Sequence, residues 1–262
     1  MSSTQVKDGG GSQRIQAIAR ASQLLDLISA NEPEGVGIAE LSRQSGLHKT
    51  TAFHILATLE DLGFVSRAEG NRKYRLGLKN LELGSMVRRH LPFRDLVYDS
   101  LLRLCSETRE TVNLAQPLPD RLLIVECLEG NYGLRAAYYA GTRSYYHATS
   151  CGKAMLAHLP EQQRRHICEA SPLIALTEST ITDVAVLYGQ LDAIRQGQAA
   201  LDFEENEVGA YCIGRPILDS ANNVLGAISV SGLKNRFDDC TRNRIDTLLK
   251  KEIGLIAQKL GR

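Results

Sequence analysis

The chain has 262 residues, enough for two domains of ordinary size, and 43% of them are hydrophobic, enough for globular cores. No apolar run approaches the roughly 18 residues that cross a bilayer, and residues 1–11 are polar and glycine-rich, so we expect a cytoplasmic protein without a membrane partner and with a disordered tail at 1–12. The net charge of +1 predicts no general affinity for nucleic acid, but residues 1–90 hold 12 Lys and Arg against 9 Asp and Glu, which favours a nucleic-acid partner for this part of the chain.

Three helices are predicted in the first part of the chain. Apolar residues recur at helical spacing over 14–30, 38–45 and 48–62. Pro33 follows the first helix, and Gly46 provides the turn between the second and third, because a residue without Cβ tolerates positive φ. The apolar residues expected to face inward are Ile15, Ile18, Ala21, Leu24, Leu25 and Ile28 in the first helix, and Ala52, Ile55, Leu56, Leu59 and Leu62 in the third.

A small hairpin and a linker helix are predicted next. Short extended segments at 64–67 and 73–76 flank a polar turn, and helical spacing resumes before Pro92. Two short helices joined by a glycine turn and followed by a hairpin form the order of a winged helix-turn-helix. We therefore predict such a domain over 13–77 and a linker helix over 78–92.

The third helix is the candidate for reading DNA in the major groove. Hydroxyl groups and short cations in its first turn suit phosphates and base edges, and the basic turn of the hairpin suits an adjacent phosphate or the minor groove. Phe53 has two interpretations: it contacts a thymine methyl group, or it packs under the hairpin or against the first helix. The predicted DNA-binding residues are Arg43, Lys49, Thr50, Thr51, Phe53, His54, Arg67, Arg72, Lys73 and Arg75.

The remainder of the chain, 93–262, has a different pattern. Strand-like segments come in two groups of three, with helical segments before, between and after them, which indicates an α+β domain built on a sheet. The expected strands are 111–117, 121–128, 132–139, 198–203, 209–218 and 223–232, and the expected helices are 94–108, a helix from Ser150, 161–169, 184–196 and 238–260, with a loop at 140–149.

Several segments together resemble the IclR family of bacterial transcription regulators over nearly the whole chain. They include IAELSRQSGLHKTTAFHILATLEDLGFV in the helix-turn-helix, and YYHATSCGKAMLAHLP, FEENEVGAYCIGRPI and VLGAISVSG in the second domain. The resemblance implies a winged helix-turn-helix, a linker helix, and a GAF-like antiparallel sheet domain that binds an effector and oligomerises. It also implies homodimers or homotetramers on palindromic operators in double-stranded DNA. The sequence departs from the family at His48, where Pro is usual, and at His54, where Arg is usual, so we expect residue 54 to recognise a different base edge or only a phosphate.

The second domain carries a candidate site for a small organic acid. Thr149, Ser150 and Cys151 open a predicted helix, and the free amides of a helix N-terminus favour a carboxylate. Ser229 and Ser231 lie two apart on one strand and so share a face, where they either meet a ligand or bond to local backbone. The resemblance implies that small keto acids are held by the backbone amides of Ser150 and Cys151 and by the side chains of Asp202, Cys212, Ser229 and Ser231.

The size of the effector stays open between aliphatic and aromatic acids. Four tyrosines precede the site, and they either wall an aromatic acid or belong to the sheet core and to subunit contacts. An arginine nearby is a candidate partner for the carboxylate. The tyrosines are Tyr138, Tyr139, Tyr145 and Tyr146, and the arginines are Arg135 and Arg143.

Two other classes of function compete with this interpretation. Cys151, with His147 four residues earlier, could form the nucleophile and base of a Cys-dependent hydrolase, but nothing beyond a helix start lowers the pKa of the thiol, and we expect no enzyme. An architectural DNA-binding protein without an effector is the second alternative. The six cysteines include no C-x-x-C pair and no zinc-finger spacing, so we expect neither a metal nor a cofactor apart from the effector.

Overall fold

The structure is a computed structural model, and the chain forms two compact units, residues 1–90 and 91–262, each of which is described by itself. The tail predicted at 1–12, the hairpin turn at 68–71 and most of the strand predicted at 132–139 lie outside the described residues. The residues that the structure describes are 15–67, 72–132, 139–170 and 173–261.

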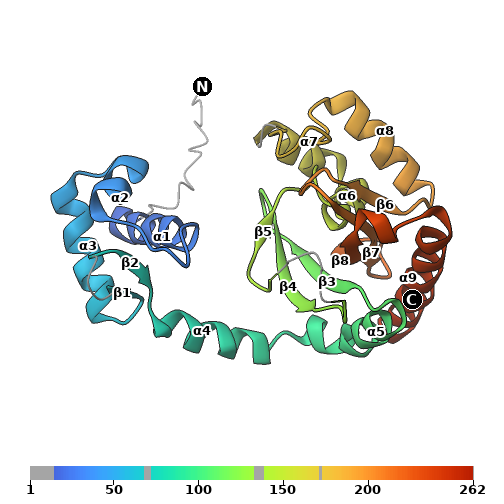
Figure 1. Cartoon of the computed structure of the whole chain (residues 1–262), viewed down its shortest axis with the longest axis horizontal. Helices are drawn as coiled ribbons and strands as arrows, with labels where there is room; N and C mark the ends of the chain where they lie inside the picture. Colours follow the sequence, from blue (N-terminus) through green and yellow to red (C-terminus); the bar gives the residue numbers. More distant parts are fainter. Residues whose placement is uncertain (1–14, 68–71, 133–138, 171–172, 262) are drawn as a thin grey trace, which may run out of the picture. The chain divides into compact units, whose positions relative to one another are not determined.

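The first unit is a helical bundle with a hairpin (Figure 1). Its elements in chain order are α1 (Gln16–Ser29), α2 (Ile38–Ser45), α3 (Lys49–Asp61), β1 (Val65–Arg67), β2 (Tyr74–Leu76) and α4 (Leu78–Arg89). Leu24, Leu41 and Leu56 bring the first three helices together in a fully buried core, to which Tyr74 of the hairpin contributes. Gly46 ends α2 in the left-handed region with a φ of 69°, the conformation predicted from its missing Cβ.

The prediction that the whole apolar stripe of each helix faces inward is wrong at the helix ends. Ile15 and Ile18 are 66% and 65% exposed, whereas Ile28 in the second half of α1 is fully buried. The core of this unit meets α1 from Ala21 onward, so the first turn of α1 extends beyond it. Leu62 is 59% exposed because it lies at the C-cap of α3, where Gly63 turns the chain away with a φ of 77°.

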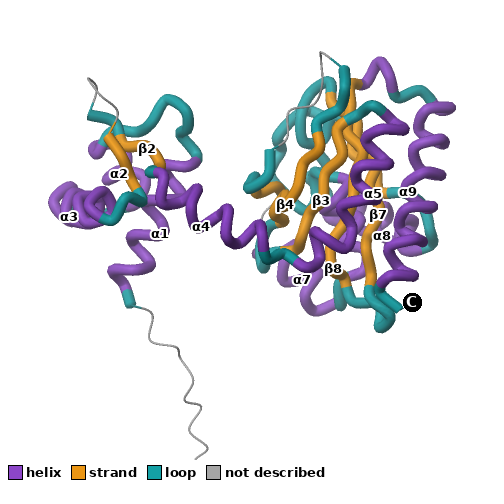
Figure 2. Tube along the Cα trace, turned by 90° about the horizontal axis from the view of Figure 1, so that it is seen from below, coloured by secondary structure: helices purple, strands orange, loops and turns teal. Residues whose placement is uncertain are grey.

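The second unit is a six-stranded antiparallel sheet between two layers of helices (Figures 1 and 2). Its strands follow the order β5-β4-β3-β8-β7-β6. The helices are α5 (Pro92–Thr108), α6 (Ser150–His158), α7 (Glu161–Ala170), α8 (Val184–Arg195) and α9 (Asp239–Lys259), and the strands are β3 (Thr111–Pro117), β4 (Leu122–Leu128), β5 (Arg143–Ser144), β6 (Ala200–Phe203), β7 (Ala210–Leu218) and β8 (Val224–Leu233).

Alternation along the strands divides the apolar residues of this sheet between two cores. Val112 and Ile228 point to the face covered by α5 and α9 and belong to the core on that side. Ala115 and Ala227 point to the opposite face and pack with α6, α7 and α8. The small side chains on the second face let α6 approach the sheet closely, so the first turn of this helix lies directly over the strands. The α+β class with an antiparallel sheet flanked by helices is thereby confirmed.

Two short elements depart from the prediction for the second unit. The segment expected as a loop at 140–149 contains β5, whose two residues pair with Leu122 and Leu123 at the edge of the sheet. A 3-10 helix at Lys234–Arg236 follows β8. Both are shorter than the windows over which hydrophobic periodicity is visible, so pattern analysis does not detect them. None of the described helices is long and apolar enough to cross a membrane.

Candidate functional site

A groove on the first unit lies between α3 and the hairpin. Lys49, Thr50 and Phe53 of α3 line it together with Arg67 and Arg72 of the hairpin, and its volume is about 420 Å³. The structure therefore brings half of the residues predicted to bind DNA to one concave surface, from two segments of the chain. Their role in DNA binding stays a prediction.

The outer face of α3 is more apolar than a surface helix requires. Phe53 is 44% exposed and meets the ring of His54 edge-on, with 5.8 Å between the ring centroids. The phenyl ring thus lies at the wall of the groove beside the hairpin rather than against α1. Thr51, also predicted to bind DNA, is only half-exposed and lies on the flank of the helix.

Two of the predicted DNA-binding arginines are engaged within the protein. Arg67 Nε lies 2.9 Å from Glu60 Oε2, and its guanidinium lies over the ring of Tyr74 at 5.3 Å. Arg43 pairs with Glu40, and its hydrogen bond lowers the pKa of that carboxyl to about 2. The other cations of the set are exposed or half-exposed on the same unit: Lys49, Arg72, Lys73 and Arg75.

Two polar rows cross the sheet of the second unit on the face that α6 covers. The antiparallel register places Asp202 directly opposite Cys212, and Cys212 directly opposite Ser231. Because these residues are cross-strand partners, their side chains project from the same face. The neighbouring row, two residues along each strand, contains Gly214, Ser229 and Asn113.

The N-terminus of α6 lies directly over these rows. Thr149 caps the helix, since its hydroxyl accepts a hydrogen bond from the backbone N–H of Gly152 at 3.1 Å. A Cβ at Gly214 would lie 2.9 Å from the carbonyl carbon of Ser150, and a Cβ at Gly152 would lie 2.3 Å from the carbonyl oxygen of Tyr146. Gly214 therefore allows the first turn of the helix to rest on β7, and Gly152 allows the segment before the helix to pack against that turn.

A small cavity remains between the first turn of α6 and the sheet, with a volume of about 20 Å³. That is room for about one water molecule. All seven residues predicted to bind an effector line it, although they come from four elements and the residue before α6. The described lining residues are Asn113, Leu122, Ile124, Ser144, Thr149, Ser150, Cys151, Asp202, Cys212, Ser229 and Ser231.

Two side-chain oxygens of the cavity have no partner among the described residues, Oδ2 of Asp202 and Oδ1 of Asn113. Asp202 is fully buried, and its other oxygen accepts a hydrogen bond from the backbone N–H of Glu205 at 2.9 Å. Asn113 is 2% exposed, and its Nδ2 donates to Ser231 Oγ at 3.2 Å. A buried polar atom without a partner costs about 1–3 kcal/mol, so a ligand that pairs with both oxygens is stabilised here.

The charge balance around the cavity is negative when Asp202 is ionised. Burial raises the pKa of Asp202 to about 7; the Glu205 backbone bond and the charge of Lys153 oppose that rise. Lys153 is itself fully buried, and its Nζ contacts Glu205 Oε1 at 2.6 Å and Gln190 Oε1 at 2.9 Å. Burial also raises the pKa of Glu205, against the charge of Lys153. None of the described lining residues carries a positive charge.

Cys151 and His147 do not form a nucleophile and base. The Cys151 thiol donates to the Ala227 carbonyl at 3.8 Å, and burial raises its pKa to about 12. His147 Nε2 lies 3.1 Å from the Ile174 carbonyl oxygen, and burial lowers the pKa of its ring. A thiol that stays protonated at neutral pH is a poor nucleophile. Among the described residues no cluster of His, Cys, Asp and Glu could hold a metal ion.

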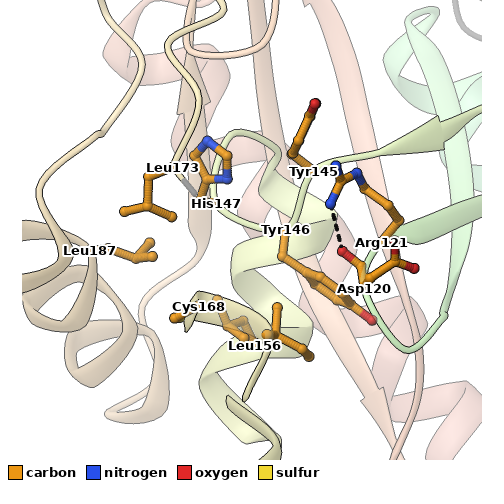
Figure 3. Close-up of a pocket in the computed structure, with 10 residues that line it drawn as sticks. Asp120, Arg121, Tyr145, Tyr146, His147, Leu156, Cys168, Leu173 and Leu187 are labelled. Atoms are coloured by element: carbon orange, nitrogen blue, oxygen red, sulfur yellow. Dashed lines mark hydrogen bonds between the residues drawn. The ribbon is translucent and has the colours of Figure 1, made fainter. Parts of the chain in front are cut away.

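The tyrosines before α6 lie around a second, smaller cavity, shown in Figure 3. Tyr146 is buried, its hydroxyl donates to the Leu118 carbonyl at 2.8 Å, and burial raises its pKa to about 12. The guanidinium of Arg121 lies over the ring of Tyr145 at 3.9 Å. These contacts hold the segment that leads into α6. Tyr145 and Tyr146 do not line the cavity under the helix, Tyr139 is 64% exposed, and Tyr138 and Arg135 lie outside the described residues.

Four lining residues were not predicted from the sequence: Asn113, Leu122, Ile124 and Ser144. One feature of the sequence could have pointed to Asn113: it is the only polar residue in the otherwise apolar run VNLA of its strand. The strand on which Ser229 and Ser231 lie pairs with this run, but the sequence contains no information on which residues stand opposite one another.

In comparisons with known protein families, both units match domains of the same family. The IclR helix-turn-helix domain matches residues 17–69, and the family described as bacterial transcriptional regulator IclR C-terminal matches residues 87–257. The chain is 32% identical over 225 residues to the HTH-type transcriptional regulator XynR of Escherichia coli (strain K12), which covers 86% of this chain and 89% of XynR.

Solved structures share the fold. The crystal structure of the Thermotoga maritima IclR superposes with a TM-score of 0.71 at 30% identity and covers 95% of this chain and 100% of that one. An IclR homolog from Microbacterium hydrocarbonoxydans, crystallised in complex with 4-hydroxybenzoate, superposes with a TM-score of 0.73 at 23% identity and covers 93% of this chain and 98% of that one.

Proposed function

Because the chain belongs to the IclR family of bacterial transcription regulators and is a DNA-binding regulator rather than an enzyme, we propose that a small organic acid in the cavity beneath α6 switches its binding to an operator. The observation that carries the proposal is a small polar cavity under the N-terminus of α6, where the first backbone N–H groups of the helix face the unpaired buried oxygens of Asp202 and Asn113. The acid acts by binding more tightly to one of two DNA-binding states than to the other.

The groove between α3 and the hairpin meets the DNA. The outer face of α3, with Thr50, Phe53 and His54, enters the major groove and reads base edges. Arg72 and the cations beside it on the hairpin contact the adjacent backbone. The exposed phenyl ring of Phe53 suits a thymine methyl group, because apolar contact with that methyl is a recurrent means of reading A·T pairs.

The protein acts as a homodimer, or as a homotetramer of two dimers, on a palindromic operator in the cytoplasm. Apolar side chains that a monomer leaves in water support self-association: Leu78, Leu81 and Val87 of α4 are 82%, 68% and 62% exposed. Two copies related by a two-fold axis place their recognition helices about one DNA turn apart, or a multiple of it.

The effector is a small aliphatic acid. Its carboxylate takes the backbone amides at the start of α6, where the positive end of the helix dipole favours an anion. Because the cavity holds about one water molecule, a small aliphatic acid requires less displacement of α6 than a benzene ring does, and Tyr145 and Tyr146 do not line it. The complex of the Microbacterium homolog with 4-hydroxybenzoate supports the general idea that this fold holds a small acid.

A route from the cavity to the linker helix runs through the start of α5. Phe93 packs against Gly226 of β8, so closely that a Cβ on that glycine would lie 2.9 Å from the ring. Arg94 Nε pairs at 2.5 Å with Glu126 of β4. Both strands flank β3, which carries Asn113. Since α5 begins three residues after the end of α4, a shift of these strands changes the angle of α4 and with it the spacing of the two recognition helices.

One experiment tests the proposal directly. Thermal unfolding of the full chain is followed with a panel of aliphatic and aromatic acids, and any acid that raises Tm is then titrated into a complex with operator DNA selected from a random pool. We expect a Tm increase and a changed operator affinity with at least one acid. An absence of both responses across the panel favours the architectural DNA-binding protein without an effector.

A double variant separates the two units. Ser229→Ala with Ser231→Ala removes the hydroxyls of the cavity and leaves the first unit unchanged, so operator binding persists while the response to the acid is lost. Thr247→Ala on α9, which removes an exposed hydroxyl of the same domain, serves as the control. A double variant that responds like the unmodified protein contradicts the assignment of the cavity.

A further inference from the structure

The cavity beneath α6 offers hydrogen-bond donors on one side and acceptors on the other. The backbone N–H groups of Ser150 and Cys151 belong to the first turn of α6, where no carbonyl of the helix can accept from them. Across the cavity, Oδ1 of Asn113 is an acceptor without a partner among the described residues. A ligand with acceptors only, such as an unsubstituted carboxylate, satisfies the first side and leaves the second unsatisfied.

Asn113 holds a fixed orientation in this cavity. Its Nδ2 donates to Ser231 Oγ at 3.2 Å and approaches Ser229 Oγ at 3.5 Å, and the residue is 2% exposed. With the amide nitrogen directed at the two serines of β8, the oxygen of the same planar group points away from them. An amide oxygen can accept but never donate. The group that completes this site therefore has to be a donor.

The two serines are oriented by the same contact. A hydroxyl oxygen that accepts a hydrogen bond keeps its own proton for another partner. Ser229 and Ser231 thus accept from Asn113 and have their protons available elsewhere, toward the thiol of Cys151 or toward a ligand oxygen. Asn113 in this way orients the hydroxyl groups of Ser229 and Ser231 as donors, and its own Oδ1 is the acceptor.

We propose that Asn113 determines the specificity of the site: its Oδ1 accepts a hydrogen bond from a hydroxyl next to the carboxylate of the effector, so the site selects 2-hydroxy acids over the same acids without that hydroxyl. The carboxylate lies on the amides of Ser150 and Cys151. The inference rests on the proposed function, because it concerns the same cavity.

Three acids of nearly equal size differ only in the group at the second carbon, and so test whether the site requires a hydrogen-bond donor there. Lactate carries a hydroxyl there, pyruvate a carbonyl oxygen and propionate only hydrogen. Isothermal titration of the full-length protein is expected to give a Kd for lactate (either enantiomer) at least about tenfold lower than for propionate, since only lactate pairs with the buried acceptor. Pyruvate, which presents an acceptor to an acceptor, is expected to bind no better than propionate.

Substitution of the amide tests the residue itself. Asn113→Leu keeps the branched shape of the side chain and removes the acceptor, so lactate and propionate should bind with Kd values within about twofold of each other. Gln116→Leu removes an amide from the same strand outside the cavity and should keep the preference of the unmodified protein. A crystal structure of the unmodified protein with lactate provides a measurement independent of any variant, and the hydroxyl should lie within hydrogen-bond distance of Asn113 Oδ1.

The outcomes separate the role of Asn113 in specificity from the effector switch itself. If the acids bind but propionate or pyruvate binds as tightly as lactate, or if Asn113→Leu keeps the preference for lactate, Asn113 does not set the specificity and the proposed function stands. A lactate hydroxyl away from Oδ1 in the crystal overturns the inference in the same way. If no small acid binds and none changes operator affinity, the proposed effector switch fails and this inference with it.

Discussion

The ammonium group of Lys153 lies 2.6 Å from the carboxylate of Glu205, and both side chains are buried beneath the first turns of α6. The pair joins α6 to the turn that follows β6. In that turn the backbone N–H of Glu205 donates a hydrogen bond to Asp202. One buried ion pair thus holds the helix above the cavity and the strand below it in a fixed relationship.

Removal of one partner of this pair is expected to destabilise the second unit. Lys153→Met leaves Glu205 buried without its counter-charge, and such a loss costs about 3–5 kcal/mol. Urea unfolding monitored by circular dichroism measures the change. Lys250→Met removes the exposed partner of a pair with Asp246 at 2.9 Å, while Asp246 keeps its bond to Arg215; this control should cost no more than about 1 kcal/mol. A similar small effect for both variants would show that the buried pair has no special role.

Stability should depend on pH through Asp202. Its pKa is about 7 in the folded protein, against an ordinary value of 3.8 for the exposed side chain in an unfolded chain, so the folded state holds the proton more tightly. The stabilisation from this group is complete below pH 4 and is lost as the pH rises through 7, by an amount on the order of 4 kcal/mol. The free energy of unfolding is measured from pH 4 to 8 for the unmodified protein and for Asp202→Asn. The unmodified protein should lose stability relative to the variant as the pH rises. A difference between the two that is the same at every pH would contradict the prediction.

Binding of an acidic effector should weaken above pH 7. An anion enters this cavity readily when Asp202 is neutral, whereas an ionised Asp202 repels it and no described lining residue offers a compensating positive charge. The Kd for lactate is therefore expected to be constant below pH 7 and to rise about tenfold per pH unit above it. Asp202→Asn, which is neutral at every pH, should bind with a flat profile; a slope that persists in this variant assigns the effect to another group.

Salt dependence should identify the phosphate contacts of the hairpin. Arg72→Ala is expected to weaken binding to operator and to random DNA alike and to lower the slope of log K against log salt by about one. Arg165→Ala removes an exposed arginine from α7 of the other unit and should leave the slope unchanged. Fluorescence anisotropy between 50 and 200 mM salt, a range of about fourfold, provides the measurement, and equal slopes for all three proteins would exclude Arg72 from the interface.

Self-association should depend on the apolar surface of α4. Leu81→Glu places a charge among side chains that we propose to be covered by a second copy, so light scattering should detect a lower mass and operator affinity should fall by at least about tenfold. Ser85→Glu adds the same charge on the same helix at an exposed polar position. If Leu81→Glu keeps the mass of the unmodified protein, α4 is not part of the subunit interface.

The architecture was predictable because the helical spacing and the strand alternation of apolar residues are both visible over several residues. The inward stripe of α3 and the alternation that sends Val112 and Ile228 to one face and Ala115 and Ala227 to the other extend over several residues each. Helix ends were less predictable, since Ile15 and Ile18 keep the period of their helix but are 66% and 65% exposed. Periodicity reports which face is apolar, and the presence of a neighbour is decided by tertiary structure.

The candidate site was predictable only in part, for a related reason. Ser229 and Ser231 stand out on one strand because their spacing of two is visible in the sequence. Asn113 faces the same cavity from the next strand, but its place depends on the register between β3 and β8, to which many non-neighbouring contacts contribute. The same holds for Gly214, whose missing Cβ matters only because α6 comes from elsewhere in the chain to rest on it.

The cavity of about 20 Å³ implies a sensitivity threshold for the regulator. A ligand larger than water binds only the fraction of molecules in which α6 has moved away from the sheet, and the apparent Kd is the intrinsic one divided by that fraction. If about 1% of the molecules are open, the response is set to a concentration about a hundredfold above the intrinsic Kd. Under the proposed switch, the closeness of α6 to β7, which Gly214 permits, therefore tunes how much acid must accumulate before operator binding changes.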